Sequence, residues 1–292
     1  MDKNITPELI EEHLRSIGIR AGDCIFVTAD LFKTGLFMKS RKHLLESWVQ
    51  IFKKVLTNEG TLIVASYSKA YPFFAINKDN PFNHLTKTTS GALSLALLND
   101  PESIRSSHPT NSYTGWGKHA KDILATHDHT SKCYDVTEKI INLSGKNLML
   151  GTIDGKNAPM VFHYCQQVLG YTLKDPFSNL SGVFYEQGGS IKRFIRKDVG
   201  GCSSAGNKLY SHFIEKDCID FGRVGAAQSC LIDCKKSFEV SLDLISKNSK
   251  FVICDDGSCI SCYGRFSNSG FLIIPFYIKK LFKFIFKITK TA

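Results

Sequence analysis

The fold of this chain is decided between residues 24 and 66, where CIFVTA (24–29) and TLIVAS (61–66) flank SRKHLLESWVQIFKKVL (40–56). The two short apolar runs are typical of buried strands, and the apolar residues of the segment between them recur at helical spacing. A strand, a helix and a strand in this order predict parallel strands with the helix packed on the sheet. The sequence therefore predicts an α/β fold, a three-layer α/β/α arrangement around a central mostly parallel or mixed sheet.

Further elements follow on both sides of this unit. A helix is expected over 6–18, and NLMLGT (147–152) predicts another buried strand. Residues 67–88 are irregular and rich in aromatic residues, so they form either a lid or substrate wall or an insertion packed on the core. Residues 183–227 are less periodic and rich in Gly and Lys. We expect them to add a smaller β-containing C-terminal part.

The stretch RSSHPTNSY (105–113) gathers polar groups within nine residues. Arg105 offers a planar fork that suits phosphate, and the hydroxyls of Ser106, Ser107 and Ser112 can donate or accept hydrogen bonds. Serines beside a proline also form capped turns. The residues alone therefore leave two interpretations open, an anion-binding loop and a structural turn.

Several motifs occur in the order found in one known family. Residues 105–112 resemble the R-S-x-H-P-x-x-S signature of the antibiotic N-acetyltransferase family, which includes the aminoglycoside 3-N-acetyltransferases. GTLIVASYS (60–68), TSGALS (89–94) and LMLGTIDGKNAPMVFHY (148–164) are similar to further segments of that family. The resemblance covers residues 5–262. It implies acetyl-CoA as the co-substrate and a small-molecule amine as the acceptor.

The resemblance also implies roles for particular residues. His163 falls on the general base for the acceptor amine, His108 would lie beside the thioester, and Gln166 would orient the acceptor. The residues implied for coenzyme binding are Thr28, Leu31, Arg105, Ser106, Ser107 and Ser112. The residues implied for acceptor binding are Tyr67, Met160 and Gln166. The alternative for either histidine is a packed core position.

Two departures from the family pattern bear on the substrate. Aminoglycoside-modifying members have acids where this chain has Met160 and Gln166, so it lacks two carboxylates that would attract a polycation. The loop after the first strand has Ala29 and Asp30 where hydroxyls are common, and Asp30 is a poor neighbour for a diphosphate. We therefore expect an acetyl-CoA-dependent N-acetyltransferase acting on another amino sugar, with surface-glycan biosynthesis as a suitable setting. The alternatives are an aminoglycoside 3-N-acetyltransferase that confers antibiotic resistance and a non-catalytic scaffold.

The charge is concentrated at the C-terminus. The formal net charge is +10, and residues 279–290 contain five lysines and no acid. On a helical wheel these lysines occupy one side, which predicts a basic amphipathic helix over 271–290 beside a single domain over 1–268. Such a helix suits peripheral contact with an anionic membrane or packing on the protein. We expect no nucleic-acid partner and a cytoplasmic protein, with the inner face of the membrane as an alternative location, and the oligomeric state stays open.

The chain has ten cysteines and begins without an apolar leader, so we expect reduced thiols and no disulfide scaffold. CDDGSCISC (254–262) nevertheless brings three thiols close together in sequence. The main expectation is no metal. The alternative is zinc at Cys254, Cys259 and Cys262, with a fourth ligand from Cys230, Cys234 or a histidine.

Overall fold

The computed structural model describes residues 5–38, 40–72, 74, 78–172, 180–196, 199–257, 259, 261, 262, 274, 275 and 278. The basic helix predicted over 271–290 lies outside the described residues, apart from Ile274, Pro275 and Ile278. None of the helices within these ranges is long and apolar enough to span a membrane.

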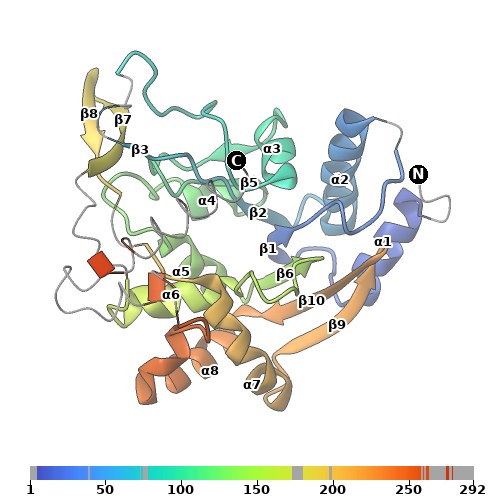
Figure 1. The fold of residues 1–292 in the computed structure, drawn as a ribbon. Coiled ribbons are helices and arrows are strands. Elements are labelled where there is room, and N and C mark those ends of the chain that lie inside the picture. The colour runs from blue at the N-terminus through green and yellow to red at the C-terminus, as the bar shows by residue number, and fades with distance from the viewer. Residues whose placement is uncertain are drawn as a thin grey trace, which may run out of the picture.

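A seven-stranded sheet forms the centre of the molecule (Figure 1). Its order is β4 (Ile104–Arg105), β5 (Tyr113–Gly117), β2 (Thr61–Ala65), β1 (Cys24–Ala29), β6 (Lys146–Leu150), β10 (Ala227–Asp233) and β9 (Ile219–Val224). β1 pairs in parallel with β2 and β6, whereas β5, β4, β10 and β9 add antiparallel pairs at the two sides. The predicted α/β fold is therefore confirmed, with a mixed sheet.

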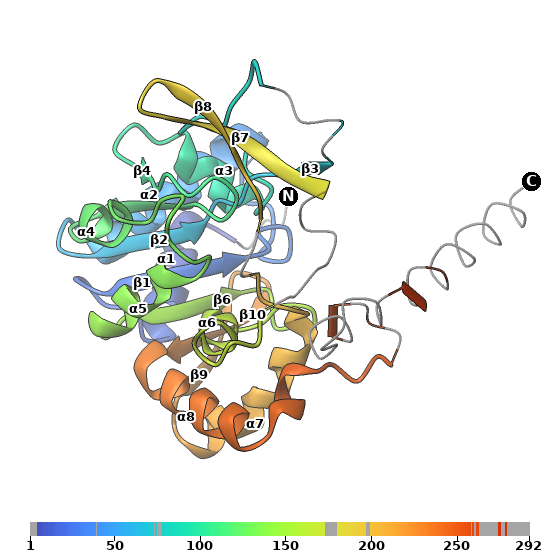
Figure 2. The same cartoon turned by 90° about the vertical axis from the view of Figure 1, so that its left-hand side faces the viewer.

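Helices cover both faces of this sheet, and the strand β1 shows why its residues are apolar without interruption. Ile25 and Val27 pack with α1 (Pro7–Ser16), α2 (Arg41–Leu56) and α3 (Ala92–Leu98). Cys24 and Phe26 face the opposite layer, because side chains alternate along a strand. That layer contains α4 (Ala120–Leu124), α5 (Asp135–Asn142), α6 (Met160–Val168), α7 (Tyr210–Glu215) and α8 (Cys234–Lys247). Figure 2 shows the sheet between the two helical layers.

A second, three-stranded sheet has the order β3 (Tyr71–Pro72), β7 (Ser181–Gln187) and β8 (Ser190–Phe194). The hairpin of β7 and β8 lies at the top of Figure 2, far from α7 and α8 at the bottom. Phe82 packs in its small core with Val183 and Phe194. Two described parts of the irregular stretch 67–88, β3 and Phe82, are therefore attached to this sheet. Two 3₁₀ helices, Ser203–Leu209 and Ser249–Val252, complete the described elements.

Candidate functional site

A cavity of about 610 Å³ opens where the parallel strands end. Thr28 at the end of β1, Ala65 at the end of β2 and Thr152 just after β6 all contribute to its wall. The carboxyl ends of parallel strands are the usual place for ligands in an open α/β sheet. The position therefore agrees with the expected location of a site.

The wall of this larger cavity is rich in hydroxyl groups. Thr28 and Leu31, both expected at a coenzyme site, belong to the wall, and Arg41 and Lys87 add two cations. Asp30 is its one carboxylate among the described residues, and Lys33 Nζ lies 3.6 Å from that group. Because a cation stands beside it, the carboxylate repels an anionic ligand less than its sequence position suggests.

A second cavity of about 270 Å³ lies deeper along the same edge. The residues that line both cavities are Thr28, Ala65, Thr89, Ser90 and Asn157, so the two spaces are adjacent. The smaller cavity is also lined by Tyr67, Tyr113, Tyr134, Met160 and Ser203. Burial raises the pKa of Tyr67 to about 12, so its phenol keeps its proton at neutral pH.

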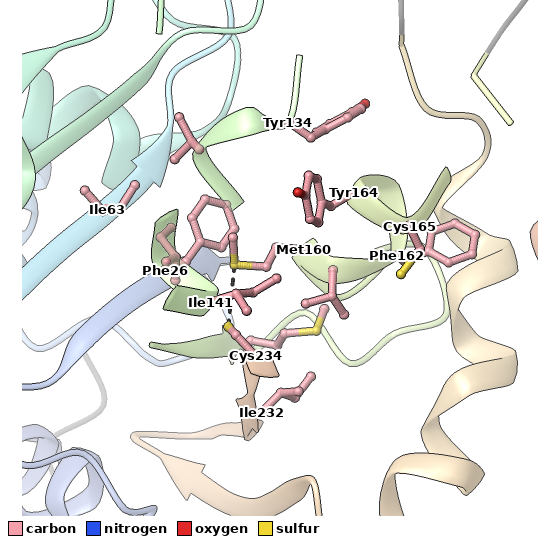
Figure 3. Close-up of a cluster of buried hydrophobic side chains, with 14 of the residues drawn as sticks. Phe26, Ile63, Tyr134, Ile141, Met160, Phe162, Tyr164, Cys165, Ile232 and Cys234 are labelled. Atoms are coloured by element: carbon pink, nitrogen blue, oxygen red, sulfur yellow. Dashed lines mark hydrogen bonds between the residues drawn. The ribbon is translucent and has the colours of Figure 1, made fainter. Parts of the chain in front are cut away.

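Met160, expected to bind the acceptor, forms part of the floor of the smaller cavity and is 7% exposed. Its sulfur accepts a weak hydrogen bond from Cys234 Sγ at 3.8 Å (Figure 3). Its backbone N–H donates to Asn147 Oδ1 at 2.9 Å. The residue therefore joins the core beneath the cavity to the cavity itself.

His163 lies at the centre of a chain of three polar side chains. Its Nδ1 is 3.1 Å from Gln166 Oε1, one helical turn along α6, and its Nε2 is 3.0 Å from Ser203 Oγ. Gln166 Oε1 also accepts the N–H of Gly201 at 3.0 Å, which identifies this atom as the amide oxygen. Because an amide oxygen can only accept, Nδ1 carries the proton and Nε2 accepts the hydroxyl of Ser203. The geometry thus leaves a basic nitrogen directed at a hydroxyl that lines the cavity.

The surroundings hold this imidazole in place. The ring of Tyr134 stacks on His163 with centroids 5.3 Å apart and planes 18° apart. The Tyr134 hydroxyl accepts the N–H of Gly200 at 2.9 Å. A Cβ on Gly200 would lie 2.4 Å from His163 Nδ1 and 2.8 Å from Gln166 Oε1. Only glycine fits this close approach of the backbone to the histidine.

Gln166 itself is fully buried. Its Nε2 is a buried amide donor that has no hydrogen-bond partner within the described ranges. An unsatisfied buried donor costs on the order of 1–3 kcal/mol. Both hydrogen bonds of the Gln166 side chain, to His163 and to Gly201, are therefore made by its oxygen.

The stretch 105–113 occupies a different place. Arg105 donates from Nε to Ser112 Oγ at 3.0 Å, and its Nη atoms donate to the carbonyls of Ser66, His84 and Thr86. Burial lowers the pKa of Arg105 to about 10, which still leaves it charged. Within the described residues, Arg105, Ser106, Ser107, His108 and Ser112 line neither cavity, and the same holds for His163 and Gln166, of which His163 contacts the lining residue Ser203. The hydrogen bonds that Arg105 donates hold it within the turn.

His108 and Ser106 also make hydrogen bonds within the turn. His108 is 1% exposed, and its Nδ1 accepts the N–H groups of Thr110 at 3.3 Å and Asn111 at 2.9 Å. Ser106 Oγ accepts the N–H of Tyr113 at 2.9 Å. These bonds close the turn on itself. Ser107 is exposed to solvent.

Sequence reasoning missed Ser203, Tyr134, Arg41 and Lys87. Ser203 follows Gly200 and Gly201 in the segment VGGCSS, and that glycine pair was the sole local signal of a close backbone approach. The histidine that Ser203 contacts lies 40 residues earlier. A contact of that separation depends on how the 3₁₀ helix packs against α6.

The cysteines also differ from expectation in one respect. Cys254, Cys259 and Cys262 do gather, but the fourth cysteine beside them is Cys202. Cys230 and Cys234, considered for that place, are buried separately, and Cys234 contacts Met160. The turn at 254–262 is therefore held against the segment that carries Ser203.

Comparison with known proteins gives this site a family context. The family model described as aminoglycoside 3-N-acetyltransferase matches residues 26–246. Solved structures with the same fold include aminoglycoside acetyltransferase AAC(3)-IVa as apoenzyme, with a TM-score of 0.71, 18% identity and coverage of 89% of this chain and 95% of that one. AAC-IIIb with CoASH has a TM-score of 0.69 and 17% identity, with coverage of 83% of this chain and 97% of that one. Sisomicin-bound AAC-VIa has a TM-score of 0.69 and 17% identity, with coverage of 83% of this chain and 98% of that one. The chain belongs to the aminoglycoside 3-N-acetyltransferase family.

Proposed function

We propose that this protein is an acetyl-CoA-dependent N-acetyltransferase that acts on the amine of an amino sugar. The observation that carries the proposal is the chain from Ser203 Oγ through His163 to Gln166, with distances of 3.0 and 3.1 Å. It ends at a cavity that adjoins a second, larger one. An acyl transfer between two substrates requires two adjacent spaces and a base with access to the acceptor, and His163 reaches the smaller cavity through Ser203.

The larger cavity suits the coenzyme. Its hydroxyl groups and the cations of Arg41 and Lys87 are complementary to a pantetheine chain and a diphosphate. The structural relative AAC-IIIb holds CoASH. Of the coenzyme residues expected from the sequence, Thr28 and Leu31 lie in this wall, and we place the donor there rather than at Arg105.

The smaller cavity suits the acceptor. Tyr67 and Met160 form walls that suit the apolar face of a sugar ring. Gln166 does not line the cavity and acts by accepting a hydrogen bond from His163. The relative AAC-VIa binds sisomicin. Here the described lining of the smaller cavity contains no carboxylate to attract a polycationic aminoglycoside. We therefore favour an amino sugar with few other cationic groups, in a setting such as surface-glycan assembly.

The chain's own residues can move the proton of the acceptor. Ser203, which lines the cavity, accepts the amine proton while its hydroxyl proton passes to His163 Nε2. The amine nitrogen forms a bond to the acetyl carbonyl carbon, and the bond from that carbon to sulfur breaks. The leaving thiolate then takes the proton from His163. Gln166 holds Nδ1–H throughout, so the ring stays oriented and its basic nitrogen faces Ser203.

Isothermal titration with acetyl-CoA is the first test of this proposal. We expect micromolar binding by the full chain, and Arg41→Ala should weaken it about tenfold because one charge-assisted contact is lost. Lys42→Ala is the matched control, since Lys42 is the exposed neighbour of Arg41 and pairs with Glu46. Absence of heat and of a thermal shift at millimolar acetyl-CoA would contradict the proposal and favour a non-catalytic scaffold.

The acceptor class needs a separate assay. Acetyl-CoA consumption should be measured with simple amino sugars, nucleotide-linked amino sugars, kanamycin and gentamicin. Faster turnover of the first two groups supports the proposal. Efficient acetylation of the antibiotics at micromolar concentration would instead support the aminoglycoside 3-N-acetyltransferase alternative. Placement at the inner face of a membrane remains a proposal from the lysine-rich tail, testable by vesicle sedimentation.

A further inference from the structure

Four cysteines gather beside the candidate site, three from the segment 254–262 and one, Cys202, from about 50 residues earlier in the chain. The sulfur atoms of Cys202, Cys254, Cys259 and Cys262 all lie within 4.8 Å of one another. The Sγ atoms of Cys254 and Cys262 are 3.4 Å apart. A tetrahedral zinc ion with Zn–S bonds of about 2.3 Å holds its four sulfurs about 3.8 Å apart. The geometry points to a structural zinc site built from these four thiolates.

The chemistry of the ligand set specifies the metal class. Four thiolates favour soft or borderline ions, and a closed set of four sulfurs leaves no position open for water or substrate. Zinc in such a site stabilises a fold and performs no chemistry itself. The ion would therefore join the loop at 254–262 to residue 202 and would take no part in acetyl transfer.

The surroundings support thiolate ligands. The N–H of Cys254 donates to Cys262 Sγ at 3.2 Å, and bonds of this kind offset the negative charge on a ligand sulfur. Lys208 lies at the same loop, where its Nζ donates to the carbonyl of Ile253 at 2.8 Å and pairs with Asp255 at 2.7 Å. Cys262 is buried, and the other three sulfurs belong to half-buried residues. The cluster is thus partly shielded from water and close to a cation.

The position of the cluster gives it a consequence for the site. Cys202 immediately precedes Ser203, whose Oγ lies 3.0 Å from His163 Nε2. Gly201, on the other side of Cys202, donates to Gln166. A metal that holds Cys202 in place would therefore also hold both contacts to the His163 and Gln166 pair. This consequence for turnover rests on the proposed function, whereas metal binding itself does not.

Metal analysis of the full chain tests the site directly. We expect about one zinc per chain after purification without chelator, measured by plasma mass spectrometry. Cys254→Ser and Cys259→Ser should each lower the zinc content at least severalfold and lower the melting temperature. Cys230→Ala is the matched control, because Cys230 is buried in β10 away from the cluster, and it should retain the metal.

Cobalt provides a second readout that does not depend on the variants folding. Wild-type protein stripped of zinc should take up Co²⁺ and show the intense visible bands of a tetrahedral thiolate complex. Any one of three results would overturn the inference. The protein could take up neither zinc nor Co²⁺, it could contain iron and sulfide in place of zinc, or the four cysteines could form disulfides. Zinc binding without acetyl-CoA binding would uphold this site while contradicting the proposed function.

Discussion

His163 and His108 are the two histidines that the sequence singles out, and the structure places them in opposite environments. His163 is half-buried, and its Nε2 faces a hydroxyl that lines a cavity. His108 is 1% exposed, and its ring stacks on His127 with centroids 4.9 Å apart and planes 13° apart. The edge of Phe194 closes another side at 5.1 Å.

Under the proposed function, this difference separates a proton carrier from a packing residue. A base must exchange its proton with a ligand, so one ring nitrogen needs a path to a cavity, which Ser203 supplies for His163. His108 instead uses Nδ1 to accept two backbone N–H groups, an interaction that requires the neutral ring. Burial, with a further contribution from His127, lowers the pKa of His108 to about 3. We therefore base the proposed roles of the two histidines on their environments and not on the residue type or its motif.

The largest expected difference between the two histidines is in turnover when each is substituted. We expect His163→Ala to lower kcat about 10²- to 10⁴-fold, the usual worth of a general base, with little change in melting temperature. His108→Asn should leave kcat within a few-fold, because Asn can still accept the two N–H groups of the turn. Steady-state kinetics and thermal unfolding of both variants provide the measurement. Equal losses of turnover in the two variants would place His108 in the catalytic machinery after all.

A second, smaller effect is the dependence of stability on pH. Burial lowers the pKa of His127 to about 4, and that of His108 to about 3, so both rings are neutral in the folded protein but gain protons near pH 6.5 when unfolded. The stability they contribute is complete above pH 6.5 and is lost as the pH falls toward 4 and 3. We expect a loss of a few kcal/mol in the free energy of unfolding between pH 7 and 4.

Urea titrations at a series of pH values measure this loss. His108→Asn should flatten the slope, because one of the two rings that stay neutral is gone, while His163→Ala should leave it nearly unchanged. The charges of Asp128 and Arg196 act on His108 in opposite directions, and those of Asp135 and Lys139 act on His127 in opposite directions, with Asp128 acting on His127 as well. An unaltered slope in His108→Asn would show that other groups cause the acid sensitivity.

Some of these features could be predicted from the sequence and others could not. Strand and helix periodicity predicted the sheet because β1, β2 and β6 are buried on both faces, which produces continuous apolar runs. The pairing of His163 with Gln166 follows from their spacing of three residues on one helix. The partner of Arg105 could not be predicted, since a guanidinium fork fits backbone carbonyls as well as phosphate. In the structure the fork donates to the carbonyls of Ser66, His84 and Thr86, which lie far from Arg105 in the sequence.

Contacts between segments that are remote in the chain could not be predicted from the sequence either. Ser203 and Cys202 lie in a short glycine-containing segment with no periodic pattern. Their partners, His163 and the cysteines at 254–262, are 40 or more residues away in opposite directions along the chain. Nothing local determines such contacts, because they arise from how the segment around residues 202 and 203 packs against α6 on one side and against the loop at 254–262 on the other. The sequence therefore indicated His163 and three of the clustered thiols, but neither the hydroxyl of Ser203 nor the fourth sulfur, that of Cys202.

The smallest effect sharpens the comparison at Gln166. In Gln166→Glu a carboxylate replaces the amide that accepts Nδ1–H, and a nearby anion favours the protonated imidazole. The acidic limb of the pH–rate profile should therefore move to higher pH, and kcat/KM above that limb should rise several-fold because the base is stronger. The change also removes the unpaired Nε2 donor, although burial of a charge lowers the melting temperature. Gln166→Met, which cannot accept Nδ1–H, should lower kcat/KM instead. Identical pH–rate profiles for wild type and both variants would show that Gln166 does not act through His163.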